Sequence, residues 1–502
     1  MCADGGALLI ALDVGTTGAR AVAVDLGGRV VAEERHPYET TSRHPGWAEQ
    51  DPRDWSEGAA AALARVVARL PEPGAVLAIG LTGQCPSVAP CDKAGLPVGP
   101  GLIYRDNRAA AEAATIRDEI GLEVLHQRTG HPSEAFHVGP KVLWLRRHEP
   151  DVFASTRVML QPRDIVLRRI GGRIATDESH ANATLFFDLR ARRWAADLFA
   201  AFDLDSALFP EALASWEVAA ELPADVASEA GLREGIPIVI GAGDSQCVAF
   251  GAGVVDPGPI SEMAGSSSCL NSAVLEPAED VRITHYNHVV PHRYTTELGL
   301  NATGASIDWA VDRLGYSGYS EFSHDVETYR AEVIGRNHAD PLAVAPLYLP
   351  YLADGERDDP TAQAALVGLS ARHSRAAVAY SIAEGVALGV SERVRTLERA
   401  GSPVEELRVA GGGAQLDVLG RIKADALRCP VLHLDADTAA VGTALLAGAA
   451  AGVEHEAQAA IAGIVSRASR FEPDERGAEV LRVRAERFNE LTSTPALHLE
   501  LR

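Results

Sequence analysis

The sequence predicts an α/β protein of two domains, in which mixed β-sheets are flanked by helices and an active-site cleft lies between the domains. The chain has 502 residues, which is more than one hydrophobic core normally serves. Short apolar, β-prone segments alternate with segments of helical periodicity. Two strand–turn–strand units with small polar turns lie at 8–28 and 260–275, and they predict a duplicated fold with a ligand between its halves.

The first of these units places an aspartate directly before a glycine-rich turn. The apolar run 8–12 ends in Asp13, a Gly-Thr-Thr-Gly turn follows at 15–18, and β-prone residues resume at Ala21. Glycines and hydroxyl side chains at a strand exit let backbone N–H groups cradle an anion. An aspartate beside an anion is unfavourable unless a cation lies between them, and Mg²⁺ on a nucleotide phosphate fits that role. A β-hairpin with a merely solvated turn explains this segment equally well.

Three further segments of the first half have the pattern of buried strands that end in polar residues. They are 75–81, before Thr82-Gly83-Gln84; 102–104, before the polar segment 105–108; and 236–240, before Gly241-Ala242-Gly243-Asp244. Open α/β sheets bind ligands at the carboxyl ends of their strands, which is where Asp244 lies. A helix N-cap or a turn would also explain Asp244, but neither explains the matching Asp13.

The second half repeats the strand–turn–strand pattern after a Pro-Gly-Pro boundary at 257–259. The elements expected after it are strands at 260–264 and 269–275 around a Gly-Ser-Ser-Ser turn, a long amphipathic helix from near Ser374 to Gly401, a strand at 407–410 before three glycines, and a small-residue helix at 438–452. We expect domains at 1–250 and 251–460, followed by a charged helical tail at 461–502.

Composition and charge argue against several classes of protein. The net charge of -23 disfavours nucleic acid or an anionic membrane as a partner. No P-loop sequence occurs and the only lysines are Lys93, Lys141 and Lys423, so phosphate chemistry must rely on arginine, backbone amides and metal. The six cysteines form no C-x-x-C pair, and no signal peptide or membrane span is recognisable. We expect a cytoplasmic protein.

Nine segments, in order, resemble the motifs of the FGGY carbohydrate kinases, a family within the actin-like, or ribonuclease H-like, ATPase fold. In the first half they are DVGTTGAR at 13–20, HPGWAEQDP at 44–52 with Trp55, LTGQ at 81–84, YRDNR at 104–108, in which tyrosine replaces a tryptophan, and GAGDSQ at 241–246. In the second half they are GSS at 265–267, TGAS at 303–306, LPYLADGERDDP at 349–360 and GGGAQLDVLGRIKAD at 411–425. So many motifs in the family's order identify the chain as a member.

The resemblance implies an ATP-dependent kinase with a sugar-binding N-terminal domain, which carries the catalytic aspartate, and a nucleotide-binding C-terminal domain. The phosphates would contact Thr16, Thr17 and the turn Gly265-Ser266-Ser267, and adenosine would lie near Gly304, Gly411 and Gly412. Asp13 would hold Mg²⁺ mainly through water, and Asp244 would be the second carboxylate that binds the metal. Asp244 would also accept the proton of the attacking hydroxyl group.

The motifs define the sugar or polyol acceptor less sharply. Where xylulose kinases have Q-M-H-G and glycerol kinases N-Q-R-E, this chain has Gln84-Cys85-Pro86-Ser87, so neither identity transfers directly. The expected substrate-binding residues are Gln84, Cys85, Asp106, Asp244 and Ser245. An ion pair of Asp106 with Arg108 on the surface is the alternative for that segment. The style of the motifs favours a xylulose-like ketose, and glycerol, a tetritol or another pentulose are the alternatives.

Two other classes of protein share parts of this pattern. A non-catalytic, actin-like nucleotide-binding regulator would have lost its base, yet both Asp13 and Asp244 are present. An acyl-phosphate kinase of the same fold would lack the sugar-site segments around Trp47 and Gln84. The resemblance also allows a homodimer, and it leaves the role of the C-terminal tail open.

Overall fold

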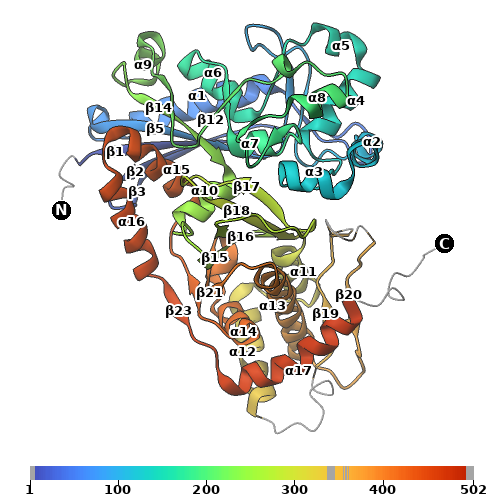
Figure 1. Cartoon of the computed structure of the whole chain (residues 1–502). Coiled ribbons are helices and arrows are strands. Elements are labelled where there is room, and N and C mark those ends of the chain that lie inside the picture. Colours follow the sequence, from blue (N-terminus) through green and yellow to red (C-terminus); the bar gives the residue numbers. More distant parts are fainter. Residues whose placement is uncertain (1–5, 336–344, 354, 357–358, 360, 493–502) are drawn as a thin grey trace. The chain divides into compact units, whose positions relative to one another are not determined.

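The computed structural model describes residues 6–335, 345–353, 355–356, 359 and 361–492. The chain divides into two compact units. The first comprises Met1–Val255, Val274–Thr296 and Thr438–Ile464, and the second comprises Asp256–Ala273, Glu297–Asp437 and Val465–Arg502. Each unit contains helices packed around a β-sheet (Figure 1).

The first unit is built on a six-stranded mixed sheet with the order β13-β14-β5-β1-β2-β3. Strands β1, β5 and β14 are parallel neighbours, so their carboxyl ends lie at one edge of the sheet. Strands β1 and β2 form the predicted antiparallel hairpin. The bounds are Leu8–Val14 for β1, Gly18–Asp25 for β2, Val30–Pro37 for β3, Val76–Gly83 for β5, Val218–Glu221 for β13 and Pro237–Gly243 for β14.

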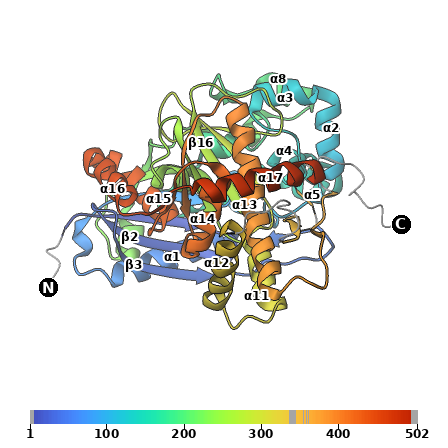
Figure 2. The same ribbon diagram turned by 90° about the horizontal axis from the view of Figure 1, so that it is seen from below.

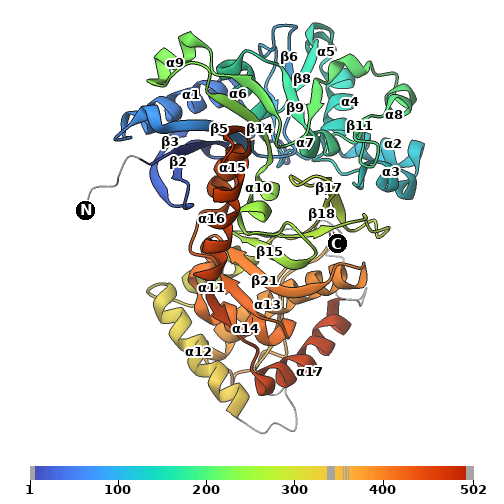
Figure 3. The same ribbon diagram turned by 60° about the vertical axis from the view of Figure 1, so that its left-hand side comes forward.

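Helices cover both faces of this sheet, because successive residues of a strand point to opposite faces. Ile10 of β1 belongs to the same core cluster as Trp55 and Leu63 of α1 (Pro52–Ala68). On the other face, α15 (Thr438–Gly448) packs so closely that a side chain at Gly80 of β5 would overlap a carbonyl of that helix. Figure 3 shows α1 and α6 (Pro162–Gly171) on one side of the sheet and α15 on the other.

The second unit has a sheet whose strands run in the order β18-β16-β15-β21-β22-β23. Strand β15 pairs antiparallel with β16 and parallel with β21, which is the layout of β1 with β2 and β5. The predicted second strand–turn–strand unit is therefore confirmed. The bounds are Gly258–Ala264 for β15, Ser268–Val274 for β16, Tyr294–Leu300 for β18, Val404–Ala410 for β21, Val431–His433 for β22 and Ser469–Phe471 for β23.

The long helix predicted after Ser374 is α13 (Arg375–Arg399). The Ser374 side chain accepts a hydrogen bond from the backbone of Ala377 and caps the helix, and Gly401 follows its end with φ of 96°. Four more helices pack with α13 in this unit (Figure 2). They are α11 (Thr303–Arg313), α12 (Tyr319–Gly335), α14 (Asp417–Leu427) and α17 (Glu475–Thr492).

The compact units do not coincide with the predicted ranges 1–250, 251–460 and 461–502, and they differ from them in two ways. As boundaries of functional domains, these ranges stay a prediction. The segment 438–464 packs with the first unit, although it follows the second unit's strands in the sequence. The residues after 461 are also more than a tail, because Leu481, Ala485 and Phe488 of α17 are buried in the hydrophobic core of the second unit. The sequence of that helix contains many charged residues and a few apolar ones. This pattern is typical of an amphipathic helix that packs on a core.

Among the described residues, no helix has the length and apolar character needed to cross a membrane.

Candidate active site

Asp13 and Asp244 lie at the same edge of the first unit's sheet, on either side of β5. Asp13 is paired in register with Thr82 of β5, and Thr82 is paired with Ala242 of β14. Strands β1 and β14 are two inter-strand spacings apart, or roughly 10 Å. Both aspartates therefore border the same edge of the sheet, with the end of β5 between them.

Gly241 shapes the strand that presents Asp244. The register of β14 against β5 shifts between Val239 and Ala242, and Gly241 has φ of 69° there. A side chain at Gly241 would overlap the carbonyl oxygen of Leu81, so this bulge requires glycine. Asp244 follows as the first residue of α10 (Asp244–Gly251), and its Oδ1 accepts a 2.8 Å hydrogen bond from the backbone of Ser245.

Two buried glutamines hold the turn that follows Asp13. Gln84 donates to the carbonyl oxygen of Gly15 at 3.3 Å and to Gln50 at 3.0 Å, and Gln50 donates to the carbonyl oxygen of Thr16 at 2.7 Å. The hydroxyl of Tyr38 also donates to Gly15, and burial together with the nearby charge of Asp13 raises the pKa of Tyr38, so that it keeps its proton. These bonds fix the carbonyl groups of the predicted phosphate turn.

Gln84 therefore has a structural role besides the predicted one. Its amide nitrogen is used by the turn, whereas its Oε1 is buried and has no hydrogen-bond partner among the described residues. A buried acceptor atom without a partner at a strand exit suits a ligand hydroxyl. The role of Gln84 in substrate binding stays a prediction.

Asp106 and Arg108 form a buried pair instead of the surface pair that was the alternative. Asp106 is fully buried, and it accepts hydrogen bonds from Arg108 and from the backbone of Ala48 at 2.7 Å. Arg108 also bonds Glu49 at 2.8 Å and lies 3.5 Å from the ring centre of Trp47. The pair thus ties the segment 47–49 to the segment 104–108, so Asp106 has a positioning role here, and its predicted contact with substrate is untested.

Lys141 is a component of this site that the sequence motifs did not reveal. It lies in α4 (Val138–His148), is fully buried, and donates to the carbonyl oxygens of Pro86 at 3.2 Å and Ile103 at 2.8 Å. Burial lowers its pKa to about 7. A lysine inside the apolar run VGPKVLWL, in a chain with three lysines, was the available signal. Lys141 links the Cys85–Ser87 segment to the strand exit at Tyr104.

The second unit contains a cavity of about 410 Å³ lined by three of the predicted motifs. Gly265 and Ser266 come from the turn between β15 and β16, Gly304 from the start of α11, and Gly412 from the short 3-10 helix before α14. Gly304 approaches the carbonyl of Gly265 so closely that a side chain there would overlap it. Four of the six nucleotide-site residues predicted for this half therefore line one cavity. Ser267 and Gly411 lie beside them in the chain and are not part of its lining.

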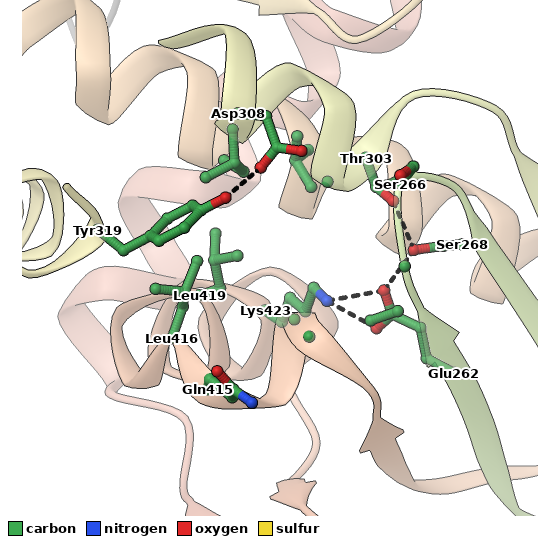
Figure 4. Close-up of a pocket in the computed structure, with 17 residues that line it drawn as sticks. Glu262, Ser266, Ser268, Thr303, Asp308, Tyr319, Gln415, Leu416, Leu419 and Lys423 are labelled. Atoms are coloured by element: carbon green, nitrogen blue, oxygen red, sulfur yellow. Dashed lines mark hydrogen bonds and ion pairs between the residues drawn. The ribbon is translucent and has the colours of Figure 1, made fainter. Parts of the chain in front are cut away.

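The cavity has a polar floor and apolar sides. Figure 4 shows Lys423 directed at Glu262, with both carboxylate oxygens within 2.8 Å, and Ser268 bonding both Glu262 and Thr303. At the other end the hydroxyl of Tyr319 donates to Asp308 at 2.6 Å. Apolar side chains complete the lining, namely Ile307, Val386, Leu416 and Leu419. A glycine-lined helix start beside an apolar slot suits a phosphate group joined to a nucleobase.

The residues present fit a magnesium ion held chiefly by water and phosphate. In the described ranges no group of three or more histidine, cysteine, aspartate or glutamate side chains could enclose a metal. Mg²⁺ in phosphoryl-transfer sites is typically bound by one or two carboxylates together with substrate phosphates. Asp13, which is only partly buried at the strand end, has the chemistry for that role.

Comparison with known proteins gives matches along nearly the whole chain. Residues 8–251 match the N-terminal domain, and residues 262–451 the C-terminal domain, of the FGGY family of carbohydrate kinases. A xylulose kinase of Bacillus subtilis is 27% identical over 88% of both chains, and a glycerol kinase of Alkalilimnicola ehrlichii is 30% identical over 94% of this chain and 96% of that one. The crystal structure of xylulose kinase from Rhodospirillum rubrum matches with a TM-score of 0.88 and 30% identity, covering 97% of this chain and 99% of that one.

Proposed function

The chain belongs to the FGGY family of carbohydrate kinases, and we propose that it transfers the γ-phosphoryl group of ATP to a hydroxyl group of a xylulose-like ketose, with Asp244 as the general base. The observation that carries the base assignment is the placement of Asp13 and Asp244 at one sheet edge, on either side of β5. As a carbohydrate kinase the protein is a phosphotransferase with an alcohol group as acceptor.

In the proposed reaction the acceptor oxygen forms a bond to the γ-phosphorus as the bond to the β-phosphate oxygen breaks, and ADP leaves. Asp244 accepts the proton of that hydroxyl group, which typically contributes about 10²–10⁴-fold to the rate. The turn Gly265-Ser266-Ser267 is proposed to hold the phosphates with Thr16 and Thr17, and Gly304, Gly411 and Gly412 are proposed to adjoin the adenosine. Asp13 would hold Mg²⁺, mainly through water, and a bound ion would supply positive charge to balance the charge of the phosphates.

The acceptor is proposed as a ketose because xylulose kinases are prominent among the relatives. Glycerol, a tetritol or another pentulose is the second candidate. The 30% identity to a glycerol kinase favours glycerol, and Cys85-Pro86, which matches neither subfamily, leaves room for a different acceptor. Gln84, Cys85, Asp106 and Ser245 are the residues proposed to contact or frame the acceptor.

A screen of ADP release tests this proposal. The full chain is incubated with ATP and Mg²⁺ over a panel of ketoses, aldoses, alditols and tetritols, with an acceptor-free reaction to measure ATP hydrolysis. We expect the fastest turnover on a pentulose. Turnover only on glycerol or a tetritol would select the second candidate, and ATP binding with no turnover on any acceptor would favour a non-catalytic regulator.

The metal role of Asp13 is tested separately. Replacing Asp13 with alanine should shift the Mg²⁺ concentration for half-maximal turnover upward and reduce the maximum, because the phosphate charge loses its organised counter-ion. Superimposable Mg²⁺ titrations of the variant and the wild type would remove Asp13 from the metal site. A cytoplasmic location and a homodimer are further predictions from the sequence, and sedimentation of the purified protein tests the second.

A further inference from the structure

A small recess lies over Gly243, one residue before the proposed base. A Cβ atom built on Gly243 would lie 3.6 Å from the Cβ of Cys85, 3.7 Å from the Oγ of Ser179 and 3.9 Å from the Cε1 of His180. These are ordinary van der Waals distances, so the absence of a side chain at Gly243 leaves a space of about one methyl group among the three residues. The recess therefore adjoins both Asp244 and the acceptor-side residue Cys85, and His180 forms one of its walls.

The ring of His180 is held in one orientation by a buried ionic network. His180 is fully buried in α7 (Glu178–Asn182), and its Nδ1 lies 2.6 Å from Oδ1 of Asp177. Asp177 is also bonded by Arg163 at 2.8 Å and by the hydroxyl of Ser179 at 2.6 Å. Although burial raises the pKa of Asp177, the charge of Arg163 and the hydrogen bonds from His180 and Ser179 outweigh it and hold that pKa far below its usual range.

This network assigns the proton of the neutral ring to Nδ1. An ionised carboxylate only accepts hydrogen bonds, so the nitrogen facing Asp177 must be the donor. The other nitrogen, Nε2, then has a lone pair to offer. Among the described residues Nε2 has no hydrogen-bond partner, although it is buried. A buried polar atom without a partner is unfavourable, and such atoms occur where a ligand completes the bond.

We propose that Nε2 of His180 accepts a hydrogen bond from a second hydroxyl group of the acceptor, and that His180 thereby selects polyhydroxylated acceptors that carry this group. The proposal rests on the proposed kinase function. Asp244 binds the hydroxyl that is phosphorylated, and His180 borders the recess next to it, so the selected hydroxyl is a different one on the same molecule. A site built to bond a hydroxyl discriminates strongly against analogues that lack it, because its polar atom is then left without a partner.

The test compares two substitutions that each keep one side of the imidazole. His180→Asn retains an amide N–H that can bond Asp177 but removes the atom at Nε2, whereas His180→Gln places an amide group near Nε2. Each protein is assayed with ATP on the best acceptor and on its series of deoxy analogues. We expect one deoxy analogue to be discriminated against by at least about 10-fold in kcat/KM by the wild type.

In His180→Asn we expect this discrimination to fall to about 2-fold or less. The variant lacks the atom that bonds the hydroxyl group, so the parent acceptor loses its advantage over the deoxy analogue, mainly through a higher KM. His180→Gln should restore part of it. Ser215→Ala is the matched control, since Ser215 also donates to Asp177, at 3.4 Å, and should leave the discrimination unchanged. Thermal unfolding and binding of a non-hydrolysable ATP analogue establish that each variant is folded.

The outcomes separate the two proposals. A wild type that turns over an acceptor, with the same deoxy discrimination in His180→Asn, overturns the role of His180 and leaves the kinase function standing. A lower Tm or kcat without loss of discrimination assigns His180 a purely structural role and also overturns the inference. Absence of turnover by the wild type on every acceptor overturns both.

Discussion

Glycines contribute as much as charged side chains to the acceptor side of this site. Gly241 permits the bulge in β14, and Gly243 leaves the recess beside His180 open, so the sequence GAGD places a carboxylate at the strand end with space next to it. Asp244 then begins α10, where the positive end of the helix dipole favours its ionised form. A carboxylate at a strand end, beside a small space, has the position that a general base for a hydroxyl group requires.

Replacing this carboxylate tests the assignment. Asp244→Asn should lower turnover by at least about 10²-fold while ATP-analogue binding stays within about 2-fold, because an amide has no acceptor oxygen of comparable basicity. Asp225→Asn, at an exposed position in the first turn of α9 (Ala224–Ala230), is the matched control. Near-normal turnover of a folded Asp244→Asn protein would exclude Asp244 as the base.

Lys141 gives a prediction for stability against pH. Burial lowers its pKa from 10.5 to about 7, so between these values the unfolded chain binds more protons at this residue than the folded chain. The free energy of unfolding therefore rises with pH over this interval, by at most about 1.4 kcal/mol per pH unit. Lys141→Met removes this contribution, and we expect the Tm of the wild type to rise relative to that of the variant from pH 7 to pH 9.

The exposed Lys93 provides the control for this measurement. Lys93→Met should keep a Tm difference from the wild type that is constant with pH. If the difference between the wild type and Lys141→Met is also constant, the ammonium group of Lys141 titrates at its usual pH and the argument from burial is wrong.

The sequence predicted the aspartates and turns better than the groups that support them. Asp13, Asp244 and Gly265 each follow an apolar strand within a few residues, so local pattern is enough to find them. Lys141 gains its significance from partners in other elements, such as Pro86, 55 residues before it. His180 bonds the nearby Asp177, but its place beside Gly243 depends on an element distant in the sequence. No local pattern carries that information, because burial and hydrogen bonding at long sequence separation are products of the fold.

At the scale of elements, α17 shows how a charged sequence can be part of a core. Arg484 is fully buried and bonds both carboxylate oxygens of Glu384 in α13, and it also donates to the carbonyl oxygens of Ala345 and Pro346. Glu384 in turn accepts a 2.9 Å bond from Tyr380. The sequence predicted a charged helical tail, and the structure shows that one arginine of this helix is bonded to buried groups of the second unit.

Removing the side chain of Arg484 should lower the free energy of unfolding substantially. Arg484→Met leaves Glu384 buried without its cationic partner, and breaking a buried pair on one side typically destabilises by about 3–5 kcal/mol. We expect a clear fall in Tm and in the denaturant midpoint of the second unit. Arg482→Met removes an exposed pair with Glu479 and Glu486 on the same helix and should change little. Equal Tm values for the two variants would show that α17 is held by its apolar residues alone.

At the scale of the whole molecule, the two substrates are assigned to residues of different units. The cavity with Glu262, Gly304 and Lys423 belongs to the second unit, whereas Cys85, His180 and Asp244 belong to the first. The two units share one layout, in which β1 and β15 each have an antiparallel partner and a parallel one. This duplication was predictable from the repeated strand–turn–strand pattern. The placement of 438–464 in the first unit was not, because nothing local to that helix marks its partner sheet.

Hydrogen exchange with each substrate alone tests this division of labour. A ligand slows exchange where it makes or stabilises hydrogen bonds, because it lowers the population of locally opened states. A non-hydrolysable ATP analogue with Mg²⁺ should protect 265–268, 303–308 and 412–419 in the second unit, and also the turn 15–18 of the first unit if Thr16 and Thr17 contact phosphate. The acceptor alone should protect 84–87, 177–182 and 243–246. Protection of the acceptor segments by nucleotide alone would contradict the assignment of the acceptor recess. No protection at 15–18 would contradict the assignment of the phosphate turn. Helix α9, which belongs to neither proposed site, supplies a region that neither ligand should protect.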